Sequence, residues 1–176
     1  MLELDEAVNQ ILAQLNQVVP YDSASVQMLD GEELEIIGGR GWDNTEDVIG
    51  IRFQIPGNNP NSVVIETGKP YHLPETWKVY EAFNSPPHDH IRSWLGVPLI
   101  AQDRTIGLLA IDSSEANHFT EENISIATEF ANQVAVVLEN ARLFKETQTQ
   151  AITDALTGVY NRRGLLQLGE FELRRA

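Results

Sequence analysis

The run with the clearest chemical potential is His88-Asp89-His90, because alternate residues of an extended segment point to the same side. Two imidazoles on one side could ligate a metal ion or a haem iron. Two ligands are too few for such a site, so His72 or a carboxylate would have to converge on them. A polar loop explains the same residues better, and we predict no metal site.

Aromatic residues are concentrated around this run. Apolar walls with a few polar tips are typical of a cleft for a small molecule. We therefore predict a ligand cleft lined by Tyr71, Trp77, Tyr80, Phe83, His90 and Trp94. The alternative is that the aromatic side chains only fill a second, minor core.

A phosphate group is a second candidate ligand. The sequence predicts a short helix that begins at Asn61 and Ser62, where backbone N–H groups without partners would point outward. Arg52 or Arg92 could add positive charge there. This hypothesis places a cyclic nucleotide or another phosphate at the start of that helix.

The sequence contains no cysteine. This excludes disulfides, thiolate zinc sites, thiol nucleophiles and any pigment attached through a thioether. We also find no Gly-rich phosphate loop and no clearly paired acidic residues. We therefore predict no catalytic residues and expect this chain not to be an enzyme by itself.

The formal net charge is −14, although residues 161–176 carry four arginines against two glutamates, a local +2 that leaves −16 for the rest. An acidic body repels phosphate backbones, so we predict no nucleic-acid partner. The first residues are acidic, and no apolar run approaches the ~18 residues of a membrane span. We expect a cytoplasmic protein without a membrane partner.

The spacing of apolar residues predicts an amphipathic helix that ends before Pro20. Its stripe consists of Leu4, Val8, Ile11, Leu15 and Val18. A hairpin is predicted next, with its turn at Asp30-Gly31. We place the apolar residues of both its strands on one face: Ala24, Val26, Met28, Leu34 and Ile36.

The middle of the chain predicts a strand at 49–55, a helix at 61–67 capped by Asn61, and a strand at 70–73. Residues 74–92 show no period and are predicted to form a lid. Two apolar strands then flank Gln102-Asp103-Arg104, and we place them in the middle of the sheet.

A long helix is predicted to begin after Thr120 and to run for more than ~30 residues, because no breaker precedes Gly158. It carries two apolar seams, so it needs two partners. We infer a parallel homodimer whose helices bundle. The residues assigned to it are Leu4, Val8, Ile11, Leu15, Val134, Leu138 and Ala141. Alternatively, both seams belong to the core of one chain.

This order of elements resembles a GAF domain across residues 1–145. The runs SWLGVPLIAQDRTIGLLAID and FTEENISIATEFANQVAVVLENARLF are similar to the closing half of that family. The resemblance implies an α+β fold, a three-layer-like α/β/α sandwich. It would have an antiparallel sheet of about six strands, helices on one face, a lid of loops and short helices on the other, and a long C-terminal helix.

The family resemblance does not name a ligand, because GAF relatives bind cyclic nucleotides, bilins, haem, amino acids and other small molecules. The lack of cysteine excludes a covalent bilin. It also excludes the chemistry of the family's free-methionine-sulfoxide reductases, which depend on cysteines. The cofactor therefore stays unknown.

The stretch TDALTGVYNRR resembles the opening motif of a GGDEF domain, the catalytic unit of diguanylate cyclases. The matching residues are Asp154, Leu156, Thr157, Asn161 and Arg162, with Arg163 after them. We interpret 154–176 as a truncated, frayed or disordered start of such a domain and 146–153 as a helical connector. The alternative is a C-terminal helix that folds back on the body.

The combined interpretation is a sensory domain that binds a small molecule, forms a homodimer, or both, and so controls a C-terminal diguanylate cyclase in cyclic di-GMP signalling. The alternative is a ligand-free scaffold that only dimerises the output domain.

Overall fold

The computed structural model describes residues 2–152. Its centre is a six-stranded antiparallel sheet with the order β3-β2-β1-β6-β5-β4. The strands are β1 (Ser23–Asp30), β2 (Glu33–Arg40), β3 (Arg52–Gln54), β4 (Tyr71–Leu73), β5 (Ser93–Ala101) and β6 (Arg104–Ser113). The predicted α+β class and antiparallel sheet are confirmed. Of the two strands predicted for its middle, β6 lies there beside β1, and β5 is the next strand outward, an interior strand between β6 and β4.

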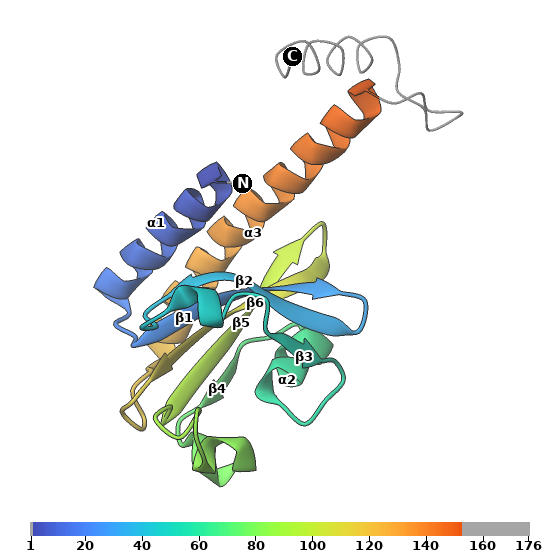
Figure 1. Cartoon of the computed structure of the whole chain (residues 1–176). Coiled ribbons are helices and arrows are strands. Elements are labelled where there is room, and N and C mark those ends of the chain that lie inside the picture. The colour runs from blue at the N-terminus through green and yellow to red at the C-terminus, as the bar shows by residue number, and fades with distance from the viewer. Residues whose placement is uncertain (1, 153–176) are drawn as a thin grey trace. The chain divides into compact units, whose positions relative to one another are not determined.

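The helices are α1 (Leu2–Val18), α2 (Pro60–Thr67) and α3 (Glu121–Ile152), with short 3-10 turns at Thr45–Asp47, Thr76–Lys78 and Glu81–Asn84. The chain divides into two compact units at residue 137. In the first unit, α1 and residues 121–137 of α3 lie on one face of the sheet, and α2 lies on the other (Figure 1). None of the helices within residues 2–152 has the length and apolar character that a membrane span requires.

Both faces of the central strands are buried. Helix α1 and residues 121–137 of α3 cover one face, called the helix face here, and α2 with residues 74–92 covers the other, called the lid face (Figure 1). On the helix face, Ala24 pairs with Ile111 and Val26 with Leu109. On the lid face, Ser25 pairs with Ala110 and Gln27 with Leu108. Side chains alternate along a strand, so of two consecutive residues one packs on the helix face and the other on the lid face.

The face predicted for Leu34 and Ile36 is wrong. They pair with Leu29 and Gln27, so both lie on the lid face, opposite to Val26. The register shift between Val26 and Gln27 leaves an extra residue in β2, and Gly38 returns to the helix face. A bulge of this kind cannot be recognised from alternation alone.

The buried stripe of α1 also differs from the prediction. Its buried residues are Val8, Leu12 and Leu15, followed by Val19, whereas Val18 is half exposed. The Tyr21 hydroxyl donates a hydrogen bond of 2.5 Å to the backbone oxygen of Leu12. This contact joins the turn after α1 to the body of the helix.

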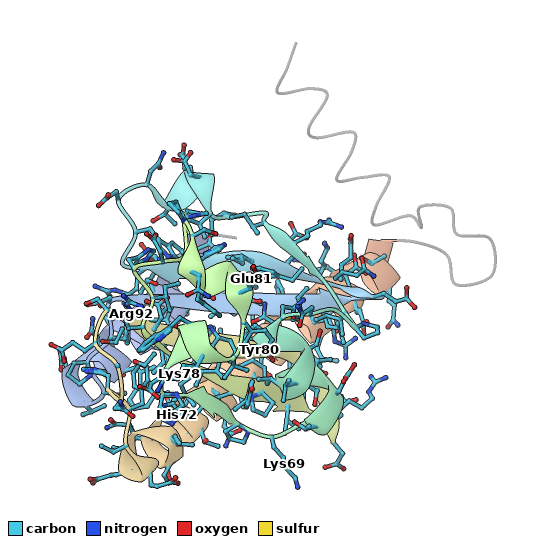
Figure 2. All side chains as sticks on the ribbon, turned by 90° about the horizontal axis from the view of Figure 1, so that it is seen from below. Lys69, His72, Lys78, Tyr80, Glu81 and Arg92 are labelled. Atoms are coloured by element: carbon cyan, nitrogen blue, oxygen red, sulfur yellow. The ribbon has the colours of Figure 1, made fainter. Side chains whose placement is uncertain are left out.

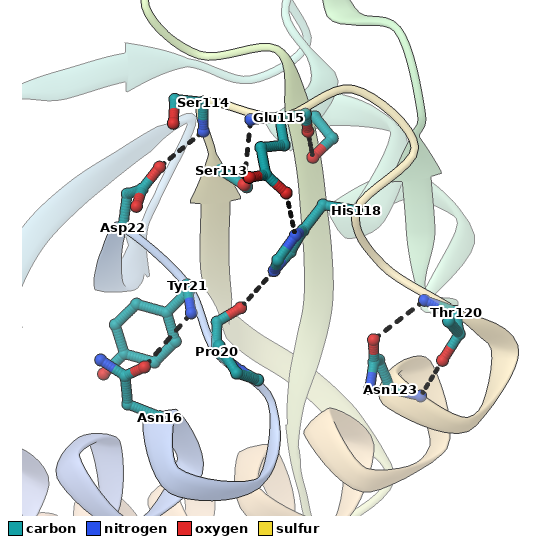
Figure 3. Close-up of polar contacts among 11 residues, drawn as sticks. Asn16, Pro20, Tyr21, Asp22, Ser113, Ser114, Glu115, His118, Thr120 and Asn123 are labelled. Carbon is teal, nitrogen blue, oxygen red and sulfur yellow. Dashed lines mark hydrogen bonds and ion pairs between the residues drawn. The ribbon is translucent and has the colours of Figure 1, made fainter.

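Polar contacts at one end of the sheet join the start of β1 to the loop before α3 (Figure 3). The Asp22 carboxylate accepts a hydrogen bond of 2.6 Å from the backbone N–H of Ser114. A His118 ring nitrogen contacts the backbone oxygen of Pro20 at 2.7 Å. Thr120 then caps α3, as predicted, because its hydroxyl accepts from the Asn123 N–H.

The second unit is described here only for residues 138–152 of α3. Arg142 forms ion pairs with Glu139 and Glu146 along the helix surface. Leu143 and Phe144 are exposed, by 41% and 64% of their surfaces. The GGDEF-like residues, from Asp154 to Arg163, lie outside the described residues.

The close contact between β1 and β6 yields a prediction about glycine. A Cβ at Gly107 would overlap the backbone oxygen of Gln27, whereas a Cβ at Gly38 would meet only Val8 Cγ1 at 3.9 Å. We expect Gly107→Ala to lower the free energy of unfolding by about 2 kcal/mol or more, because the backbones would have to separate. Gly38→Ala should stay within ~1 kcal/mol. Urea denaturation measures both, and equal stabilities would contradict the register.

Candidate small-molecule site

A cavity of about 510 Å³ lies on the lid face of the sheet within the first unit. Three segments close it over the strands: the loop 42–51, the start of α2 at 58–61, and the lid segment, defined here as residues 74–92. Its apolar walls include Ile36, Phe53, Phe83, Trp94 and Ala110. This size and character suit a small organic ligand.

The floor of the cavity is a row of polar side chains from the two central strands. Ser23, Ser25 and Gln27 project from β1, and Asp112 projects from β6 directly opposite Ser23. The Ser23 hydroxyl donates a 2.6 Å hydrogen bond to Asp112 Oδ2. Gln27 Nε2 donates a 2.9 Å hydrogen bond to Ser25 Oγ. These bonds fix the side chains of the floor on the sheet.

The surroundings of Asp112 strongly perturb its carboxyl. Burial raises its pKa from 3.8 to about 6, and this effect outweighs the hydrogen bond from Ser23 and the nearby His90, which lower the pKa. Asp22 raises it further. A carboxyl in such surroundings changes its charge close to physiological pH.

Of the residues predicted to bind a ligand, Asn61, Tyr80, Phe83, His90 and Trp94 line the cavity. The edge-to-face pair of Tyr80 and Phe83, with ring centroids 6.4 Å apart, forms part of its roof. Burial and a hydrogen bond with Tyr71 raise the pKa of Tyr80 to about 12, so its hydroxyl stays protonated.

Tyr71 and Trp77 do not line the cavity but support it. The Tyr71 ring packs edge-to-face on Trp94, with centroids 6.4 Å apart. Trp77 lies under the Arg92 guanidinium, 4.6 Å from the ring centroid. The side-chain view places Arg92 apart from Tyr80 (Figure 2). The predicted aromatic residues therefore fall into two groups. Tyr80, Phe83 and Trp94 line the cavity, whereas Tyr71 and Trp77 pack around it.

The geometry disfavours a phosphate site at α2. Its N-cap is Asn59 rather than Asn61, and the Asn59 side chain accepts the hydrogen bond from the Ser62 N–H. Ser62 Oγ also accepts from the Gly57 N–H, and Ser62 is absent from the cavity lining. The cap is displaced because Pro60 favours the first helical position.

The two predicted arginines are engaged elsewhere. Arg52, on the edge strand β3, forms ion pairs of 2.7 and 3.1 Å with Glu33 and Glu35 on the neighbouring β2. Arg92 stacks on Trp77. Among the described residues that line the cavity there is no lysine or arginine.

The histidines do not converge. His88 and His90 line the cavity, whereas His72 packs against Phe119, with ring centroids 6.1 Å apart. Burial lowers the pKa of His72, against the opposite effect of Glu121. Within residues 2–152, no three His, Asp or Glu side chains form a group that could hold a metal ion.

Sequence reasoning missed the polar floor. Ser23, Ser25 and Gln27 alternate with Ala24 and Val26, and Asp112 follows the buried strand run. This alternation of polar and apolar residues in a strand that is buried on both faces was the available signal. In the sequence, this alternation cannot be distinguished from that of an ordinary half-exposed strand, because only the tertiary structure shows that the lid segment covers the polar face.

The model of the GAF domain family matches residues 3–138. The chain belongs to the GAF domain family. It is thus a sensory and regulatory domain of the kind found in signalling proteins, as the resemblance implied. A search of curated proteins gave no match.

Solved structures share this fold at low sequence identity. A GAF domain of a phosphoenolpyruvate-protein phosphotransferase from Coxiella burnetii has a TM-score of 0.70 and 23% identity, over 81% of this chain and 86% of its own. The GAF-B domain of DevS from Mycobacterium smegmatis has a TM-score of 0.64 and 21% identity, over 82% and 98%. A type II free methionine-R-sulfoxide reductase from Thermoplasma acidophilum has a TM-score of 0.60 and 21% identity, over 78% and 96%.

The buried carboxyl predicts an unusual pH dependence. Because the folded chain raises the pKa of Asp112 to about 6, it binds that proton more tightly than the unfolded chain. The resulting stability is complete below the ordinary pKa of 3.8 and is lost as the pH rises through about 6. Relative to Asp112→Asn, the wild type should lose up to ~3 kcal/mol between acidic and neutral pH.

Urea denaturation of both proteins across this range measures the effect. Both proteins contain His72, whose lowered pKa has the opposite effect on the pH dependence of stability, so the comparison cancels that contribution. Glu66→Gln, which removes an exposed carboxylate on α2, serves as the control and should follow the wild type. Parallel profiles of the wild type and Asp112→Asn would contradict the assignment.

Proposed function

We propose that this GAF domain binds a small molecule in the lid-face cavity and transmits its occupancy through α3 to an output domain. The observation that carries the proposal is a cavity of about 510 Å³ with apolar walls and a polar floor. Such a floor would be costly to bury in a domain that only packs against other chains. A ligand that pairs with the floor offsets that cost.

The lid segment supports a binding role because it is anchored at its ends. The Thr76 hydroxyl donates a 2.6 Å hydrogen bond to the backbone oxygen of Ile91. The Asn117 N–H donates a 2.8 Å bond to the backbone oxygen of Pro74. Residues between these anchors, such as His88 and His90, are exposed at the rim of the cavity and can admit a ligand.

We further propose that the output is a diguanylate cyclase. The support is the resemblance of Asp154–Arg163 to the start of a GGDEF domain, directly after the helix that ends at Ile152. Cyclases of this type need two catalytic domains face to face. A change in the geometry of two paired helices could therefore switch their activity.

Pairing of two chains through α3 is part of this proposal. In the second unit, Leu143 and Phe144 expose adjacent apolar side chains on the helix. In the first unit, Val8, Leu15 and Val134 are buried within the chain, so the pairing does not use them. Leu4, Ile11 and Ala141 are partly exposed and remain candidates.

A helix deletion tests transmission in the natural gene product with its full downstream sequence. Deletion of Thr147 should rotate the output by about 100° and change cyclic di-GMP synthesis from GTP several-fold. Deletion of residues 146–152 removes about two turns, restores the helical phase and should retain most of the activity. Equal output from both deletions and the parent would contradict helical transmission, and a gene without a GGDEF sequence would overturn the cyclase assignment.

The pairing is tested by replacing Leu143 and Phe144 with glutamine. We expect the wild-type chain to have twice the monomer mass in light scattering and the double variant to dissociate at least ~10-fold more readily, because its apolar contact is lost. Val79→Gln is the matched control, since Val79 is 56% exposed on the lid segment. A monomeric wild type would contradict the pairing.

Native mass spectrometry separates the sensor from the ligand-free scaffold. A small molecule retained after gentle purification supports the sensor. An empty dimer whose output does not respond to added ligands supports the scaffold.

A further inference from the structure

Asp112, on the cavity floor, contains a buried carboxylate oxygen that the described part of the chain leaves without a hydrogen-bond partner. Asp112 Oδ2 receives the Ser23 hydroxyl, whereas Asp112 Oδ1 is buried and has no hydrogen-bond partner among residues 2–152. Buried polar atoms are nearly always paired in folded proteins. A bound molecule with a hydrogen-bond donor would satisfy Oδ1.

A second unpaired acceptor lies on the same floor. Gln27 donates through Nε2 to Ser25, and its Oε1 is buried without a partner among the described residues. The residue itself is only 3% exposed. Ser23, Ser25 and Gln27 share one face of β1, and Gln27 and Asp112 both line the same cavity. A ligand that satisfies them must present hydrogen-bond donors.

The charges around the cavity favour a cation. Its described lining contains the carboxyls of Asp47 and Asp112, the imidazoles of His88 and His90, and no lysine or arginine. The whole chain carries a formal charge of −14. An anionic ligand would therefore enter a negative field without a permanent positive partner. A cation would gain an ion pair with Asp112 in an environment of low dielectric constant.

The walls define the rest of the ligand. Phe53, Phe83 and Trp94 give the cavity apolar and aromatic surfaces above the polar row. Such surfaces bury an apolar body, and aromatic faces also attract cations. Groups with two or more N–H donors on an apolar body match both parts of the site.

We propose that the cavity binds a small organic cation, a primary amine or an amidine on an apolar body, whose N–H groups pair with Asp112 Oδ1 and Gln27 Oε1. This inference rests on the proposed function, because it names the chemical class of the molecule sensed. Ser23 acts as a positioning residue, since its hydrogen bond holds Asp112 Oδ2 and leaves Oδ1 available to a ligand.

Isothermal titration calorimetry with defined probes tests this. Near neutral pH, 2-phenylethylamine or benzamidine at millimolar concentration should give saturable binding to the wild-type chain. The anion 3-phenylpropionate, of similar size, should give none. Asp112→Asn should weaken binding of the amine ~10-fold or more, because it removes the charge partner. Gln27→Met should weaken it several-fold through loss of the second acceptor.

Glu66→Gln is the matched control, because it removes one negative charge from an exposed position of α2 and should leave binding unchanged. Circular dichroism and thermal melting verify that each variant is folded. For the wild type, binding should also weaken as the pH falls below the carboxyl's pKa of about 6. This dependence should be smaller in Asp112→Asn.

Three results would overturn the proposal: no heat from either cationic probe, equal affinity for 3-phenylpropionate, or unchanged binding in Asp112→Asn. Failure of this inference is distinct from failure of the sensor. A neutral or anionic molecule retained in native mass spectra would exclude the amine class and still support a sensor.

Discussion

The structure depends on the pairing of β1 with β6 in a sheet that is covered on both faces. Along these two strands, one side chain enters the helix-side core and the next enters the lid-side interior, which holds the cavity and the apolar cluster beside it. Val26 and Leu109 serve the first interior, and Gln27 and Leu108 serve the second. The backbones approach so closely at Gly107 that the register has little freedom to shift. One ladder of hydrogen bonds thus positions the core and the site together.

The fold was largely predictable because its local signals agree with its global arrangement. Pro20, the Asp30-Gly31 turn, Gly68 and the Thr120 cap mark element boundaries through backbone conformation or missing donors, which depend only on nearby residues. The periodicity of apolar residues was less reliable where two faces of a helix are similarly apolar. On α1, the apolar residues cover more than one face, and the packed helix buries Leu12 and leaves Ile11 partly exposed.

The site was only partly predictable for a related reason. Aromatic residues such as Phe83 and Trp94 could be identified from composition, because large rings concentrate in clefts and cores alike. The polar floor could not be predicted in this way, because the tertiary structure decides which face of β1 the lid segment covers. Arg52 and Arg92 show the opposite case, since their charge suggested a ligand but neighbouring side chains already engage it.

The contacts at the end of the sheet bear on how a structural change in the cavity could reach α3. Asp112 is the last floor residue, Ser114 is held by Asp22, and α3 begins at Glu121, so the floor and the base of that helix lie within one short stretch of backbone. The Pro20 contact of His118 ties the same stretch to the end of α1. A movement of the floor would therefore act on a segment that these hydrogen bonds hold in place. Under the proposed function, it would tilt the first turn of α3, and a tilt at the base of a helix grows into a larger sideways displacement with distance along its axis.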